Sequence, residues 1–126
     1  MTKTGEIYRC VVCGNLVEVV RGGGGELHCC GRPMEKVEEN TEDASHEKHI
    51  PVMEPEAGGW RVTVGSVEHP MLKEHYIEWI ELQTKCGIQR CRLQPGDRPV
   101  AHFKTTAPVV AVRAYCNLHG LWRVER

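Results

Sequence analysis

Alternation of apolar and polar residues dominates the chain from about residue 47 to its end. Apolar side chains recur at nearly every second position in six short segments, residues 60–64, 76–82, 88–93, 100–104, 109–115 and 121–124. Glycines and prolines that favour turns separate these segments. Because neighbouring side chains of a strand point to opposite faces, this period predicts strands with one buried face. Short strands at this spacing predict an antiparallel β-sandwich, and no long segment has a helical period.

Two segments carry more specific expectations. Residues 109–115 are almost wholly apolar, which predicts a central, mostly buried strand. In residues 76–82 the alternation places Glu78 and Glu81 near the solvent side of the sheet.

The first part of the chain follows another pattern, in which cysteines stand at both ends of one predicted hairpin. Residues 16–20 predict a short strand, and Gly22 to Gly25 predict a turn, since four glycines lose too much backbone entropy in regular structure. A polar, acidic stretch follows and predicts a linker. We therefore expect three parts: a small domain at residues 1–36, a linker at 37–46 and a β-sandwich domain at 47–126.

Composition narrows the function classes. The 126 residues have a formal net charge of -1, so no overall basic field attracts nucleic acid. No apolar run approaches the roughly 20 residues of a membrane span, and the first residues lack the apolar core of a signal peptide. We expect a cytoplasmic protein. In a reducing compartment, clusters among its seven cysteines predict metal ligands rather than disulfides.

Four of the cysteines predict a tetrahedral thiolate site: Cys10, Cys13, Cys29 and Cys30. The first two form a C-x-x-C motif, which lets two thiolates reach one ion. The other two are adjacent, so both can bind one ion only if the backbone bends there, and Gly31 supplies freedom for that bend. Zinc and iron both accept four thiolates, and the spacing does not separate them.

A second set of donors flanks the ends of the predicted strands. Loops from distant positions meet at one end of an antiparallel sandwich, so these side chains can converge outside the core. The set is His49, His69, His75, Cys116 and His119. Structural zinc sites close at four ligands, whereas five nitrogen and sulfur donors suit an octahedral iron with one open position. His28, His46 and His102 lie in polar surroundings or inside a strand and are predicted not to be ligands.

Two residues beside this set could act on a substrate. Lys48 precedes His49, and an ammonium near the open position would attract an anion and assist its protonation. Glu47 could occupy the open position when iron is ferric. Cys86 and Cys91 have no predicted role.

Two alternatives use part of the same pattern. A copper protein of the cupredoxin type also has a C-x-x-H near its C-terminus, but it needs fewer histidines, and no methionine follows His119. A binding module stapled by zinc explains the early cysteines but leaves the histidines unused.

These motifs together resemble the desulfoferrodoxin family, the two-iron class of superoxide reductases. The resemblance covers nearly the whole chain and includes C-x-x-C with the adjacent cysteines, Glu47-Lys48-His49, His69-Pro70-Met71 with His75, and Cys116-Asn117-Leu118-His119-Gly120. It implies a desulforedoxin-like N-terminal domain with iron on four cysteines and an immunoglobulin-like sandwich with the catalytic iron. There the four histidines would be equatorial ligands and Cys116 the axial one.

The resemblance also implies a function and partners. The family reduces superoxide to hydrogen peroxide without making oxygen, takes electrons from rubredoxin or a similar donor, and is typically homodimeric. It assigns Lys48 the assisting role and Glu47 the role of sixth ligand in the ferric state. From the residues themselves we expect backbone N–H groups of Leu118 and His119 to donate hydrogen bonds to the Cys116 sulfur.

Overall fold

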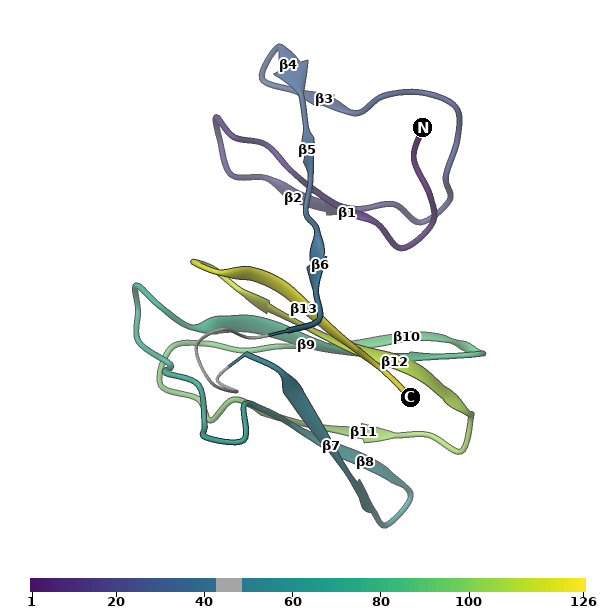
Figure 1. The fold of residues 1–126 in the computed structure, drawn as a ribbon, viewed down its shortest axis with the longest axis vertical. Helices are drawn as coiled ribbons and strands as arrows, with labels where there is room; N and C mark the ends of the chain where they lie inside the picture. The colour runs from purple at the N-terminus through teal and green to yellow at the C-terminus, as the bar shows by residue number, and fades with distance from the viewer. Residues whose placement is uncertain (43–48) are drawn as a thin grey trace. The chain divides into compact units, whose positions relative to one another are not determined.

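The structure is a computed structural model that describes residues 1–42 and 49–126. These residues form β-strands and connecting segments, and they contain no helix that could span a membrane. The chain divides into two compact units, Met1–Glu38 and Glu39–Arg126 (Figure 1). The predicted all-β class is confirmed.

Unit 1 holds five very short strands. Their bounds are β1 (Ile7–Arg9), β2 (Leu16–Glu18), β3 (His28–Cys29), β4 (Arg32–Pro33) and β5 (Glu35–Lys36). One sheet has the order β2-β1-β5, and β3 pairs with β4. The buried hydrophobic residues of this unit are Ile7, Cys10 and Val19. So small a core gives little stability, because a chain of this length buries too small a fraction of its surface.

Unit 2 is a sandwich of two sheets. Its strands are β6 (Glu39–Asn40), β7 (Pro51–Glu56), β8 (Gly59–Val64), β9 (Ile77–Thr84), β10 (Gly87–Arg92), β11 (Val100–Lys104), β12 (Val109–Cys116) and β13 (Gly120–Glu125). The larger sheet has the order β10-β9-β12-β13-β6, and the smaller has the order β11-β8-β7. All pairings are antiparallel except that of β6 with β13.

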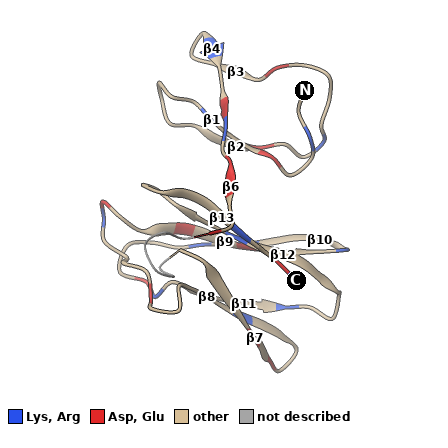
Figure 2. Cartoon of the chain, in the orientation of Figure 1, with Lys and Arg blue, Asp and Glu red and all other residues tan. Residues whose placement is uncertain are grey.

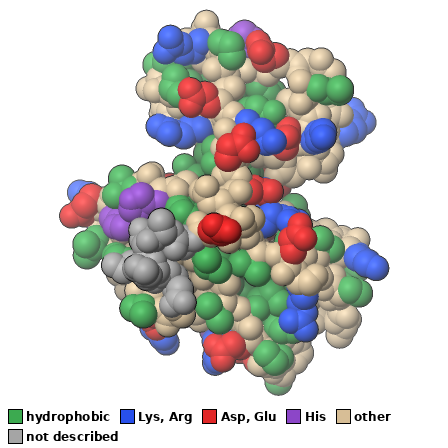
Figure 3. All heavy atoms as spheres, viewed as in Figure 1, with side chains coloured by type: hydrophobic (Ala, Val, Ile, Leu, Met, Phe, Trp, Pro, Cys, Tyr) green, Lys and Arg blue, Asp and Glu red, His purple; other side chains and the backbone are tan. Residues whose placement is uncertain are grey.

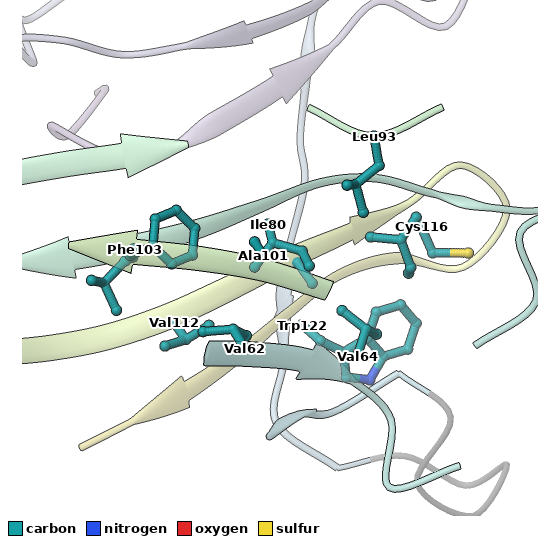
Figure 4. Packing of buried hydrophobic residues seen from close by; sticks show 12 residues of the cluster. Val62, Val64, Ile80, Leu93, Ala101, Phe103, Val112, Cys116 and Trp122 are labelled. Atoms are coloured by element: carbon teal, nitrogen blue, oxygen red, sulfur yellow. The ribbon is translucent and has the colours of Figure 1, made fainter. Parts of the chain in front are cut away.

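Alternating side chains of both sheets fill the space between them. Val62, Ile80, Phe103 and Val112 come from four different strands and meet in one buried cluster (Figure 4). Cys116 is completely buried at one end of this cluster, and its sulfur points away from the other labelled side chains (Figure 4). The core therefore fixes the position of a predicted metal ligand.

Two strands of unit 2 were not expected from the alternation. β7 contains Pro51 and Pro55 and lies at the edge of the smaller sheet, where a residue without an N–H is tolerated. β6 belongs to the stretch predicted as linker, yet Glu39 and Asn40 pair with Leu121 and Trp122 of β13. The boundaries of the predicted domains and linker remain a prediction.

The expected solvent exposure of Glu81 is wrong. This residue is completely buried in β9, directly opposite Arg113 of β12, which is also buried. Arg113 Nε donates to Glu81 Oε2 at 2.6 Å, and Arg113 also pairs with Glu39 of β6 at 3.2 Å. Burial alone would raise the pKa of Glu81, but the hydrogen bond and charge of Arg113, together with hydrogen bonds from Arg90 and Gln83, outweigh it and hold the pKa below its usual range. Acidic positions on β6 and β9 are marked in Figure 2.

Candidate metal centres

The four early cysteines converge at one end of unit 1. Their sulfur atoms all lie within 4.8 Å of one another. The Cys13 and Cys29 sulfurs are 3.7 Å apart, and those of Cys29 and Cys30 are 3.9 Å apart. These separations suit four thiolates around one ion, since metal–sulfur bonds of about 2.3 Å place tetrahedral sulfurs about 3.8 Å apart.

The predicted bend between the adjacent cysteines is confirmed. Cys30 has a φ of 54° and Gly31 a φ of 75°. A residue other than glycine rarely adopts this left-handed conformation, because its Cβ meets the backbone. The bend allows both side chains, which would otherwise point to opposite faces, to reach the same ion.

Electrostatics explain why these four thiols need a cation. Cys13 N–H donates to the Cys10 sulfur at 3.5 Å, and this backbone hydrogen bond, with smaller contributions from the Val12 backbone and the neighbouring thiols, lowers the pKa of Cys10 to about 6. The neighbouring sulfurs, that of Cys13 most strongly, raise the pKa of Cys30 to about 12. Cys10 therefore ionises readily, while Cys29 and Cys30 resist a second negative charge. A bound metal ion removes that resistance.

Loss of this metal should unfold unit 1 and spare unit 2. Replacing Cys13 by serine removes one thiolate, and the buried residues of unit 1 are too few to hold it folded. We expect amide hydrogen exchange to become fast across residues 1–38 and to stay slow in β9, β12 and β13. Cys86→Ser, at an exposed cysteine outside both donor clusters, is the control. Slow exchange retained across residues 1–38 of Cys13→Ser would contradict the expectation.

The second donor set comes from segments far apart in the sequence. His49 precedes β7, and His69 and His75 lie between β8 and β9. Cys116 ends β12, and His119 precedes β13. In the space-filling view, histidine side chains gather at one end of unit 2 (Figure 3). Antiparallel strands bring these segments to one end, as the sequence predicted.

The four imidazole rings stand at the corners of a near-square. Neighbouring ring centres are 4.7 Å apart for His49–His69 and for His69–His75. They are 5.0 Å apart for His75–His119 and 4.9 Å for His49–His119. The measured diagonal, from His49 to His75, is 6.4 Å. Half of this diagonal, about 3.2 Å, is the length of a metal–nitrogen bond of about 2.1 Å plus the distance from nitrogen to ring centre.

The positions of individual ring nitrogens also fit one ion at the centre of the four rings. His49 Nε2 and His119 Nδ1 are 3.0 Å apart, the separation of two nitrogens held at right angles about 2.1 Å from one ion. His69 Nδ1 donates to the Pro70 carbonyl oxygen at 2.7 Å, which leaves its Nε2 as the metal-binding atom. That Nε2 is buried and has no hydrogen-bond partner among the described residues. Burial lowers the pKa of His69 to about 4, so the ring is neutral, as a ligand must be.

Cys116 supplies the sulfur donor. It belongs with His49, His75 and His119 to a group whose donor atoms lie within 4.8 Å of one another. Burial raises the pKa of the Cys116 thiol, and hydrogen bonds from the backbone of His119 and of Leu118 oppose that rise. These are the two hydrogen bonds that the sequence predicted. They orient the sulfur and temper its electron donation to a metal.

The four histidines differ in their exposure to solvent. His49 and His69 are buried, His75 is half-buried and His119 is exposed. The Trp122 ring stacks on His49 with centres 4.2 Å apart and an interplanar angle of 13°. This contact was not predicted, because nothing in the spacing of Trp122 distinguishes it from a core aromatic residue. The contact fixes the orientation of one ligand ring.

Other predicted residues lie elsewhere. Glu47 and Lys48 fall outside the described residues, as does His46. His28 and His102 pair with glutamates at 2.7 and 2.8 Å and belong to neither donor cluster among the described residues. Cys86 and Cys91 are also in neither cluster.

A cupredoxin-type copper site and a structural zinc site both fit this geometry poorly. Four imidazoles with one sulfur exceed the two histidines and one cysteine of a blue-copper site. A purely structural zinc site would close at four ligands.

Comparison with known proteins agrees with both centres. The family model "Desulfoferrodoxin" matches residues 41–125, and "Desulfoferrodoxin, N-terminal domain" matches residues 2–37. The desulfoferrodoxin of Nitratidesulfovibrio vulgaris is 53% identical over 120 residues, covering 95% of each chain. The desulfoferrodoxin homolog of Archaeoglobus fulgidus is 51% identical over 123 residues, covering 98% of each.

A solved structure extends the similarity to the fold. The superoxide reductase from Treponema pallidum superposes with a TM-score of 0.75 at 35% identity, covering 95% of this chain and 98% of that one. The matches cover both units of this chain and agree with the geometry of its two donor clusters. The chain belongs to the desulfoferrodoxin family.

Proposed function

We propose that this protein is a superoxide reductase with two iron sites. The reaction consumes one superoxide, one electron and two protons and forms one hydrogen peroxide, with no oxygen released. The observation that carries the proposal is the near-square of four imidazoles beside a buried cysteine sulfur. The names of relatives and of similar structures support the same activity.

The ligand assignments follow from the donors. We assign the first iron to Cys10, Cys13, Cys29 and Cys30. We assign the catalytic iron to His49, His69, His75, His119 and Cys116. When bound as ferrous ion, iron at this second site supplies the electron and an open position for a small anion.

The protein's own groups determine how that chemistry runs. Neutral imidazoles leave the ferrous site with a net positive charge, which attracts superoxide. The Cys116 thiolate lowers the cost of the ferric state, and the N–H groups of Leu118 and His119 limit how strongly it donates. Release of peroxide without cleavage of its oxygen–oxygen bond requires that limit.

Several finer features belong to the same proposal. Lys48 attracts the anion and assists its protonation, and Glu47 occupies the open position in the ferric state. Rubredoxin or a similar small redox protein re-reduces the iron. The protein works as a homodimer in the cytoplasm.

Mixing the reduced protein with superoxide generated by pulse radiolysis tests the activity. We expect a bimolecular reaction that yields one hydrogen peroxide per superoxide and no oxygen. Oxygen formed at half the amount of superoxide would show dismutation instead and would refute the proposal.

The same experiment tests Lys48. Replacing it by isoleucine should slow the bimolecular reaction about tenfold and weaken its dependence on ionic strength, since steering by charge is screened by salt. Lys85→Ile makes the same change of charge at an exposed position beyond the far end of β9 and should react like the parent. Equal rates in Lys48→Ile and the parent would remove the steering role.

A further inference from the structure

The side chain of Asn117 lies between the segment that carries His75 and the segment that carries Cys116 and His119. Tyr76 N–H donates to Asn117 Oδ1 at 2.9 Å. Asn117 Nδ2 donates to the Glu74 carbonyl oxygen at 3.1 Å. Glu74 and Tyr76 are the neighbours of His75 on either side. One amide group therefore grips the backbone on both sides of a histidine ligand while its own residue follows the ligand Cys116.

The backbone of Asn117 adds a third hydrogen bond. Its N–H donates to the Tyr76 carbonyl oxygen at 3.2 Å. In a regular antiparallel ladder, both groups of a residue such as Tyr76 bond to the backbone of one partner. Here one bond goes to the backbone of Asn117 and the other to its side chain. The side-chain oxygen thus takes the place of a backbone carbonyl at the end of the β9–β12 ladder.

Because a side-chain oxygen replaces the backbone acceptor, the backbone after Cys116 is free to leave the sheet. The last paired residues are Cys116 and Ile77, and the register shifts between Tyr115 and Cys116. Directly afterwards the backbone turns so that Leu118 and His119 donate to the Cys116 sulfur. A chain that continued the ladder through its own carbonyl at Asn117 could not make this turn at the same point. The asparagine side chain completes the ladder while the backbone turns around the metal site.

We propose that Asn117 is a positioning residue that holds His75 in register with Cys116 and His119, so that the donors are arranged before metal binds. The other side of His75 is already fixed, because its backbone exchanges hydrogen bonds of 2.9 and 3.1 Å with Leu72. Asn117 closes the remaining side. The inference rests on the metal site of the proposed function and not on its reaction with superoxide, so an assay without superoxide tests it separately.

Release of iron from the intact, fully loaded protein measures this role. Ferrous iron is transferred without oxygen to excess bipyridyl, and the two sites are followed separately, the cysteine site by its loss of thiolate absorption. Asn117→Ala removes both side-chain hydrogen bonds, and Asn117→Asp keeps the acceptor for Tyr76 but loses the donor to Glu74. We expect release from the histidine site to accelerate about 10- to 100-fold in Asn117→Ala and less in Asn117→Asp. The cysteine site should release iron at the parent rate in both and serves as an internal reference.

Thr84 provides a matched control at the other end of β9. Its Oγ1 accepts from Cys86 N–H at 3.1 Å and donates to the Gly87 carbonyl at 3.3 Å, so it also bonds to two backbone groups. Thr84→Ala should release iron like the parent. Parent-like release from Asn117→Ala overturns the proposal, as does equal acceleration in Thr84→Ala, which would indicate general loosening of the sheet. If Asn117→Ala fails to fold, Asn117→Asp decides, and parent-like release from it overturns the proposal.

Discussion

Replacing Cys116 by serine should lower the rate of superoxide reduction by at least about a hundredfold while the protein stays folded. Loss of groups that only orient a ligand costs about 10- to 100-fold, so loss of the ligand itself should cost at least the upper value. Serine has nearly the same shape, and its hydroxyl can accept the hydrogen bonds of Leu118 and His119. It does not ionise near neutral pH, so the site loses a negative charge and the ferric state becomes harder to reach.

Three measurements check this result. Pulse radiolysis gives the rate, the visible spectrum shows the loss of sulfur-to-iron absorption from the histidine site, and metal analysis shows whether the iron of the cysteine site is retained. Cys91→Ser is the control, because Cys91 is partly buried and packs against the same core without belonging to a donor cluster. A Cys116→Ser protein that reduces superoxide at the parent rate would exclude this sulfur from the reaction.

Replacing Arg113 by methionine should destabilise unit 2 by up to about 3–5 kcal/mol, the usual cost of removing one member of a buried ion pair, with the partly exposed Arg90 left as the remaining cationic partner of Glu81. Glu81 is completely buried, and Arg113 donates to it at 2.6 Å. The double variant Arg113→Met/Glu81→Leu should recover much of the loss, since it leaves no carboxylate in the core. Urea unfolding followed by tryptophan fluorescence measures both changes.

An exposed ion pair in the same unit calibrates this expectation. Arg98 pairs with Glu68, and their side chains are 74% and 46% exposed. Arg98→Ala should therefore cost less than about 1 kcal/mol. If Arg113→Met cost no more than Arg98→Ala, the buried pair would have no special part in the stability of the sandwich.

The strands could be predicted where alternation reflects one buried face, as in β8, β9 and β11. The same reasoning failed for Glu81, because its carboxylate is bound by arginines of both neighbouring strands, Arg90 of β10 and Arg113 of β12. Arg113 lies 32 positions away, and only the register of β9 against β12 brings it opposite Glu81. β7 was missed because its prolines argue against a strand unless its place at a sheet edge is known.

The metal centres were more predictable than the groups that support them. Cysteine and histidine are uncommon and chemically distinctive, so their positions at strand ends were informative. The ring of Trp122 and the amide of Asn117 use ordinary packing and hydrogen bonding. Their roles depend on which loop lies opposite them, and spacing along the chain does not contain that information.

The two donor sets differ in how far apart they lie along the polypeptide. Cys10 and Cys29 are 19 positions apart, whereas His49 and His119 are 70 positions apart. Ribosomes make the chain from its N-terminus, and units fold in that order. All four thiols have been synthesised before the first imidazole of the other set, so the cysteine centre can capture its ion on a nascent chain. The centre that meets superoxide cannot be complete until His119 has been synthesised.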